Sequence, residues 1–157
     1  MKKIKIKPLI IALLVPVSVG LVSAFITSAK MDAFEAVNKP SFSPPSILFP
    51  IVWTVLYILM GVSSYLVLTS PSSQKKIDKA LLAYGISLVL NFFWSIIFFN
   101  LEAFSFAFLW LCILLAVVIY TLVLYFKINR IAAYLQIPYV LWLIFAGVLN
   151  ISIAAMN

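Results

Sequence analysis

Five long runs without a charged residue determine what this chain can fold into. They lie at about residues 8–29, 47–69, 80–99, 104–126 and 131–156. Each has about the 20 residues that an α-helix needs to cross the ~30 Å hydrocarbon core of a bilayer. Because hydrocarbon offers the backbone no hydrogen-bond partner, such runs cross as helices. The sequence therefore predicts an all-α integral membrane protein, a bundle of five transmembrane helices forming one domain over residues 1–157.

The composition agrees with membrane residence. Of 157 residues, 66% are hydrophobic and 10% are charged, and the mean hydropathy is +1.21. A soluble domain of this length could not cover so much apolar surface. The net charge of +7 comes from lysines between the apolar runs, which is typical of membrane anchoring and not of a nucleic-acid surface. Short links between the runs predict that sequential helices are antiparallel neighbours.

Several kinds of chemistry are excluded by residues that the sequence lacks. There is no histidine, and the single cysteine, Cys112, allows neither an intrachain disulfide nor a thiolate metal cluster. Ion-driven transporters usually keep a carboxylate inside the membrane. Here all four acidic residues fall between the apolar runs: Asp32, Glu35, Asp78 and Glu102. We expect no metal, no intrinsic cofactor and no acid–base pair.

The positive charges predict an orientation. Nine lysine and arginine residues belong to the N-terminus and the links at 70–79 and 127–130, whereas the opposite side has only Lys30 and Lys39. The positive-inside rule places the N-terminus in the cytoplasm, and the 30–46 loop and the C-terminus outside. The first run could instead be a signal peptide, but it is longer than the apolar region of most signal peptides.

Tryptophans and asparagines gather in the half of the spans predicted to face outside. These residues are Trp53, Trp94, Trp110, Trp142, Asn91 and Asn150. Trp142, Ala146 and Asn150 are spaced by four residues, and Asn91 and Trp94 by three, so each set shares a helix face. An interfacial tryptophan belt would also appear at the inner surface, where no tryptophan occurs. Shared aromatic and amide faces therefore favour a pocket.

Two of these features have a structural alternative. A lone asparagine within a membrane span more often hydrogen-bonds to another helix than to a ligand, which applies to Asn91 and Asn150. Gly20, Ala24 and Ser28 form a small-residue face on the first helix. For that face, close helix packing is the favoured interpretation over contact with a ligand.

The 30–46 loop contains prolines and an aromatic residue just before the second helix. These are Pro40, Phe42, Pro44 and Pro45. Proline denies the chain helical hydrogen bonds and holds it extended, so the loop can cross the ends of the helices. A stiff segment loses little entropy when it closes on a ligand. We interpret the loop as a lid.

Three sequence segments carry a family resemblance. They are residues 39–45 continuing through 49–54 (KPSFSPP, FPIVWT), residues 90–95 (LNFFWS), and residues 138–142 with Phe145, Ala146, Leu149 and Asn150. On these motifs the chain resembles the TspO, or translocator protein, family of tryptophan-rich sensory proteins, once called peripheral benzodiazepine receptors. It is identified as a bacterial member.

The resemblance implies a five-helix homodimer in the membrane that binds porphyrins such as protoporphyrin IX and benzodiazepine-type ligands. It implies light-dependent breakdown of bound porphyrin at the tryptophans resembling Trp53 and Trp142. The implied ligand-binding residues are Trp53, Asn91, Trp94, Trp142, Ala146, Leu149 and Asn150, under the lid residues Pro40, Phe42, Pro44 and Pro45. Phe42 stands where the family often has tryptophan, and residues 151–157 lack the animal sterol motif, so sterol binding stays open.

The function favoured by the sequence is a membrane tetrapyrrole-binding protein that promotes light-dependent oxidative degradation of porphyrins. Trp53 and Trp142 would act as oxidisable electron donors, and whether this is a true enzyme stays open because no acid–base pair exists. The alternative is a carrier or sensor of porphyrins and similar amphiphiles, such as sterols or lipids. The expected partners are the tetrapyrrole, membrane lipids and a second copy of the chain, with no nucleic acid.

Overall fold

The computed structural model describes residues 4–30 and 35–157, and the regular elements of this part are helical. The five long helices are α1 (Ile6–Ser28), α3 (Leu48–Leu68), α4 (Gln74–Ser95), α5 (Phe104–Ile128) and α6 (Arg130–Met156). A π-helical turn, Ile96–Asn100, continues α4. Each of the five spans is long and apolar enough to cross a membrane. The predicted five-helix membrane fold is therefore confirmed.

Helix α4 begins earlier than the sequence predicted. The prediction placed its start at residue 80, the first residue of a charge-free run, whereas the helix begins at Gln74. The backbone carbonyl of Ser73 accepts hydrogen bonds from the amides of Lys76 and Ile77 at 3.0 and 3.2 Å. Gln74 also donates to Asp78 at 2.7 Å, one turn further along. The length of a charge-free run is therefore shorter than the helix when the first turns of the helix carry charged residues and extend beyond the apolar region.

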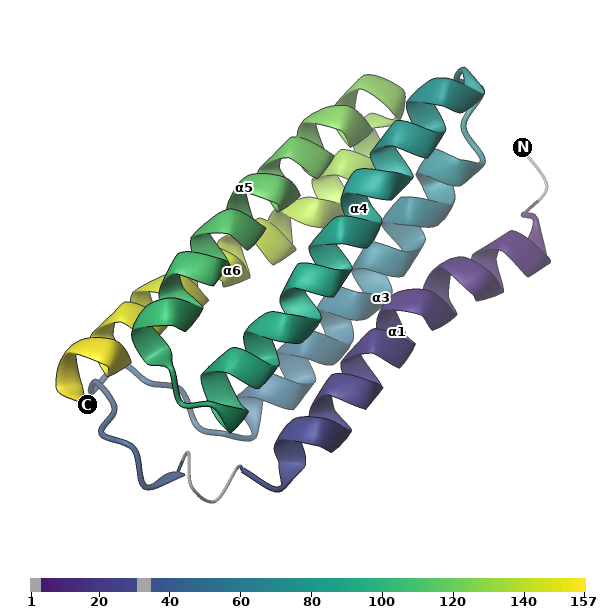
Figure 1. The fold of residues 1–157 in the computed structure, drawn as a ribbon. Helices are drawn as coiled ribbons and strands as arrows, with labels where there is room; N and C mark the ends of the chain where they lie inside the picture. The colour runs from purple at the N-terminus through teal and green to yellow at the C-terminus, as the bar shows by residue number, and fades with distance from the viewer. Residues whose placement is uncertain (1–3, 31–34) are drawn as a thin grey trace.

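The helices form an elongated bundle in which α3 lies between α1 and α6, and α5 lies between α4 and α6 (Figure 1). The expectation that sequential helices are neighbours is confirmed, since each long helix packs on the next. Helix α3 in addition packs on α6, more extensively than on α4. Helix α1 forms one edge of the bundle. The described part of the 30–46 loop lies at the same end as the C-terminus, and the start of α1 lies at the opposite end.

A single residue joins α5 to α6. Asn129 has extended backbone angles of φ −152° and ψ 113°, which stop one helix and start the next. Its side-chain oxygen accepts hydrogen bonds from the amides of Ile131 and Ala132 at 3.0 and 3.2 Å. Asparagine is a preferred N-cap because it satisfies amides that the first helical turn leaves without partners. The sharp turn between these helices therefore depends on Asn129.

The buried side chains form two clusters along the bundle. The first core cluster lies on the Asn129 side and includes Met60, Val67, Tyr125 and Leu143, each with no exposed surface. The second core cluster lies on the C-terminal side and comprises Trp94, Ile97, Phe98, Ala107, Leu111, Ala146, Leu149 and Ile153. Trp53 packs against both clusters. It therefore marks the boundary between the two halves of the bundle.

The cap at α6 gives a stability prediction. We expect Asn129→Ala to lower the free energy of unfolding by about 1 kcal/mol, because two amides of α6 lose their acceptor. Asn129→Asp keeps the acceptor oxygen and should retain most of this stability. Thermal unfolding in detergent would measure both variants, and an alanine variant as stable as the unmodified protein would contradict the prediction.

Candidate ligand-binding site

A cavity of about 260 Å³ lies between α1, α3, α4 and the π-helical turn, at the end of the bundle where the 35–46 segment lies. Its lining residues are Gly20, Ser23, Ala24, Thr27, Ser28, Phe49, Pro50, Trp53, Tyr57, Trp94, Ser95 and Phe99. Ala24 and Ser28 line the cavity and are nevertheless exposed. The cavity therefore opens beside α1, on the side of the bundle.

The wall on α1 is made of small and hydroxyl-bearing residues. The sequence favoured close helix packing for Gly20, Ala24 and Ser28, but in the described chain all three line the cavity. At Gly20 the packing interpretation is confirmed as well, because a β-carbon there would overlap the Tyr57 ring of α3. Helix α1 also approaches α3 closely at Gly61, where a β-carbon would lie 2.9 Å from the Ala12 carbonyl oxygen. Within this small-residue face, Gly20 packs against α3, whereas Ala24 and Ser28 leave space beside the bundle.

The opposite wall is aromatic. Trp53 stacks on Tyr57 with ring centroids 5.5 Å apart, and it meets Trp142 almost at a right angle, with centroids 6.5 Å apart. Phe49 contacts the edge of the same Trp142 ring at 6.0 Å. Trp142 does not line the cavity itself. It lies behind Trp53, so the two tryptophans occupy different positions in the site.

A second, much smaller space lies behind this aromatic wall. It has about 20 Å³ and is lined by Phe49, Trp53, Trp94, Phe98, Phe99, Trp142, Ala146, Leu149 and Asn150. That volume is about what one water molecule needs. Trp53 and Trp94 line both spaces. The residues expected on α6 therefore come together around a nearly filled void, adjacent to the open cavity.

Both predicted asparagines hydrogen-bond to other helices. Asn91 is fully buried, lines neither space, and donates to the Tyr57 hydroxyl at 2.9 Å. Asn150 accepts from the Trp94 indole N–H at 3.4 Å and donates to the Phe104 carbonyl at 2.8 Å. These bonds match the structural alternative for membrane asparagines. They hold Tyr57 and Trp94, which do line the cavity.

The π-helical turn brings two phenylalanines to the site. Phe98 stacks on Trp94 with centroids 5.2 Å apart, and Phe99 contacts the edge of the Trp94 ring at 6.3 Å. The next residue, Asn100, donates from its side chain to the Ile26 carbonyl of α1 at 3.2 Å. The turn therefore both extends the aromatic wall and ties it to α1.

Sequence reasoning missed four aromatic residues of the site: Phe49, Tyr57, Phe98 and Phe99. The first two could have been found, because residues 49, 53 and 57 are four apart and share a helix face. Phe98 and Phe99 depend on the π-helical turn, which hydrophobic periodicity does not reveal. Trp110, grouped with the other tryptophans, donates to the Leu90 carbonyl at 2.8 Å and lines neither space.

The predicted lid is described from residue 35 onward, and its residues 31–34 lie outside the described part. Pro40, Phe42, Pro44 and Pro45 line neither the cavity nor the void, and Phe42 is 48% exposed. The segment is instead attached to the end of α6. Asn38 donates its amide to the Asn157 side-chain oxygen at 3.1 Å, and the Asn157 side chain donates to the Asn38 carbonyl at 2.9 Å.

An exposed carboxylate holds the 35–46 segment together internally. Glu35 accepts hydrogen bonds from the Ser46 hydroxyl and from the Lys39 ammonium, the latter at 3.2 Å. Both bonds and the positive charge of Lys39 lower the pKa of Glu35 below its ordinary value. A lowered pKa means that these contacts hold near neutral pH and are lost as the pH falls through that pKa.

The chain is similar in sequence to several known proteins. Residues 12–156 match the model of the TspO/MBR family. The chain is 33% identical over 150 residues to the tryptophan-rich protein TspO of Archaeoglobus fulgidus, covering 95% of this chain and 96% of that protein. It is 31% identical over 124 residues to the tryptophan-rich protein TspO of Chlorobaculum tepidum, covering 79% and 78%. It is 31% identical over 131 residues to the human translocator protein, covering 82% and 76%.

The attachment of the 35–46 segment to α6 can be tested by hydrogen exchange. We expect Asn157→Ala to speed exchange of the Asn38 amide by about tenfold or more, because it removes two hydrogen bonds of roughly 1 kcal/mol each. Ser152→Ala is the matched control, since its hydroxyl bonds within α6 to the Val148 carbonyl. Unchanged exchange at Asn38 in Asn157→Ala would show that other contacts hold the segment.

Proposed function

This chain belongs to the TspO/MBR family, and on that premise we propose that it binds porphyrins such as protoporphyrin IX and promotes their light-dependent oxidative degradation. The observation that carries the proposal is the position of Trp53. Its ring forms part of the cavity wall, and the Trp142 ring lies directly behind it, 6.5 Å away. The oxidisable Trp53 indole thus faces the cavity, and the Trp142 indole lies within contact distance of it.

The chemistry of the cavity walls suits a flat, conjugated and amphipathic ligand. Trp53, Trp94 and Phe99 supply aromatic faces and edges to which a macrocycle can stack. On the α1 side, the hydroxyls of Thr27 and Ser28 can exchange their present bonds to backbone carbonyls for bonds to polar ligand edges. One apolar wall and a few placed polar groups are the usual composition of a ligand site.

The volume requires α1 to move when a porphyrin binds. Ligand pockets usually have about 300–1,000 Å³, so the cavity of about 260 Å³ is slightly too small even for a compact ligand. Helix α1 has the smallest buried share of the five spans, 17% against 28–44% for the others. Displacing α1 therefore disturbs less packing than displacing any other helix. We propose that binding widens the cavity at this wall.

The two tryptophans have different roles in this proposal. Trp53 contacts the ligand and gives an electron to the photo-excited porphyrin. The porphyrin anion radical adds O2 and the electron then returns to the oxidised indole, so the net change is oxygenation of the porphyrin by O2. Trp142 does not reach the cavity, so it acts through Trp53 by supplying an electron to the oxidised indole. The reactive chemistry belongs to the porphyrin and to light, and the protein binds and orients the ligand.

A carrier or sensor without chemistry is the alternative. A carrier needs a route to the other side of the membrane, whereas Met60, Val67 and Tyr125 fill the opposite half of the bundle without exposed surface. This packing supports binding over carriage. With the lysine-rich end in the cytoplasm, as the positive-inside rule indicates, the proposed site lies in the outer half of the membrane. A homodimer is part of the same proposal.

Titration with protoporphyrin IX, first in the dark and then under illumination, tests the proposal. We expect saturable quenching of tryptophan fluorescence, followed by light-dependent bleaching of porphyrin absorbance. Trp142→Phe should leave the dissociation constant unchanged and slow the bleaching several-fold. Trp53→Phe should slow the bleaching and weaken binding by at most about tenfold, because one stacking contact changes.

The outcomes separate the functions. Saturable quenching without bleaching would leave a binder or carrier, and no saturable quenching would contradict porphyrin binding altogether. Bleaching at an unchanged rate in the Trp53→Phe, Trp142→Phe double variant would remove both indoles from the mechanism.

A second prediction concerns the wall on α1. We expect Ala24→Phe to weaken protoporphyrin IX binding about tenfold or more, because a ring at the mouth competes for the ligand volume. Leu21→Phe is the matched control, since Leu21 is 67% exposed and does not line the cavity. Equal affinities for the two variants would show that the ligand binds elsewhere.

A further inference from the structure

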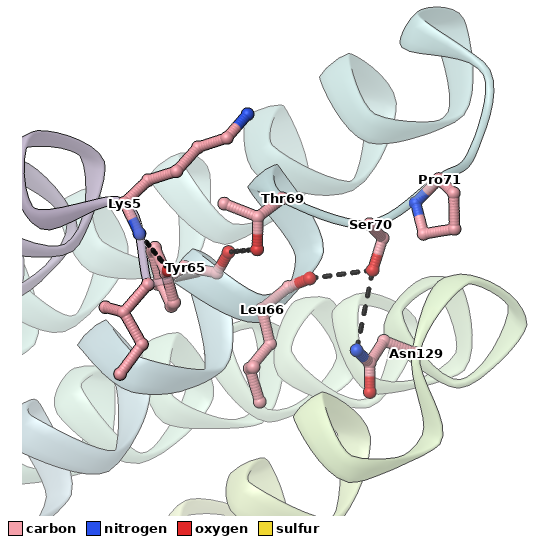
Figure 2. Close-up of a pocket in the computed structure, with 8 residues that line it drawn as sticks. Lys5, Tyr65, Leu66, Thr69, Ser70, Pro71 and Asn129 are labelled. Carbon is pink, nitrogen blue, oxygen red and sulfur yellow. Dashed lines mark hydrogen bonds between the residues drawn. The ribbon is translucent and has the colours of Figure 1, made fainter. Parts of the chain in front are cut away.

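A second concavity lies at the opposite end of the bundle from the candidate site (Figure 2). It is an open crevice of about 590 Å³ where the start of α1, the end of α3 and the α5–α6 joint meet. Its lining residues are Ile4, Lys5, Tyr65, Leu66, Thr69, Ser70, Pro71 and Asn129. The proposed porphyrin function uses none of these residues.

Hydrogen bonds fix the polar side of the crevice. The Lys5 amide donates to the Tyr65 hydroxyl oxygen at 3.0 Å, and in Figure 2 the Lys5 side chain extends away from this bond. Ser70 donates to the Leu66 carbonyl at 2.7 Å and accepts from the Asn129 side chain at 3.4 Å. In the described part of the chain no group accepts the Tyr65 hydroxyl proton, so it can donate to a ligand.

Positive charge dominates this end of the bundle. The cations described there are Lys5, Lys7, Lys75, Lys76, Lys79, Lys127 and Arg130. Asp78, the acidic residue described at this end, accepts a hydrogen bond from Gln74. Among residues 4–30 and 35–157, the salt bridge joins Lys39 to Glu35, at the other end. Most of the positive charge at this end is therefore not balanced by a carboxylate of the described chain.

We propose that this crevice binds the headgroup of an anionic phospholipid. Lys5 lines it, and Lys127 and Arg130 are close in sequence to the lining residue Asn129, so a phosphate there lies at a basic end of the bundle. Ile4 and Leu66 provide apolar contact for the glycerol and upper acyl region. The crevice lies where membrane-spanning helices end, which is the depth of lipid headgroups. Basic residues at this depth attract anionic lipid.

Three features favour an anionic lipid over other occupants. Free phosphate would use the cations but not the apolar side of the crevice. A zwitterionic lipid would use the apolar side but would bring no net charge to the cations. An anionic phospholipid satisfies both sides together, and the crevice opens at the bundle surface where lipid can enter laterally.

The experiment titrates the full-length protein, in a neutral detergent, with dioleoyl phosphatidylglycerol and measures bound lipid by native mass spectrometry. We expect Lys5→Gln to weaken binding about fivefold, the loss expected for one cation near a headgroup. Thr69→Phe, which keeps the charge but fills the crevice, should weaken binding by at least as much. Lys75→Gln is the matched control, because Lys75 is exposed outside the crevice, and its effect should stay within about twofold.

Several outcomes would overturn the proposal. Equal losses in Lys5→Gln and Lys75→Gln would show diffuse attraction to the whole basic end. Equal affinity for dioleoyl phosphatidylcholine would remove the role of headgroup charge, and displacement of the lipid by inorganic phosphate at the same concentration would indicate a free-anion site. If Thr69→Phe does not fold, Tyr65→Phe replaces it and should also weaken binding. Protoporphyrin IX affinity, measured without added lipid, should be unchanged in Lys5→Gln, so this test is independent of the proposed function.

Discussion

The structure depends on one constraint, that backbone polar groups within a membrane must find their hydrogen-bond partners inside the protein. The backbone meets it by forming helices, and several hydroxyls meet it by bonding to a carbonyl of their own helix, as Thr27, Ser95 and Thr121 do. Few side chains therefore remain to connect one helix to another. The distribution of those few connections decides which parts of the bundle are rigid.

Most interhelical hydrogen bonds join α3, α4, α5 and α6. Asn91 bonds to Tyr57, Asn150 joins Trp94 to the start of α5, and Ser63 bonds to the Ala132 carbonyl. In the described part of the chain, α1 and its N-cap have such bonds only at their two ends, from Lys5 to Tyr65 and from Asn100 to Ile26. The aromatic wall of the cavity is thus held by hydrogen bonds between neighbouring helices, while the α1 wall is hydrogen-bonded near its ends and otherwise held by packing, as at Gly20 and Gly61. A ligand can meet a pre-organised wall on one side and an adjustable one on the other.

The sequence could predict the helices because charge-free length and bilayer thickness are physically linked. It could also predict that Trp53 and Trp94 belong to one site, because both occupy similar depth. It could not show that Asn91 lies behind Tyr57, since helix periodicity gives a face but not what covers that face. The same limit explains Gly20, Ala24 and Ser28, whose small side chains suit close packing and an open cavity equally well. The position of Phe99 depends on a π-helical turn, and tertiary contacts determine where such a turn forms.

Helix α1 lines the cavity, and Ile4 and Lys5, which directly precede α1, line the crevice at the lysine-rich end. The bond between Lys5 and Tyr65 lies in the crevice. The bond between Asn100 and Ile26 joins the sequence neighbours of Phe99 and Thr27, which line the cavity. An occupant of either concavity changes the surroundings of one attachment point of the same helix. To the extent that both occupants alter the position of α1, their binding free energies are coupled. Linkage then requires each to change the affinity of the other by the same factor.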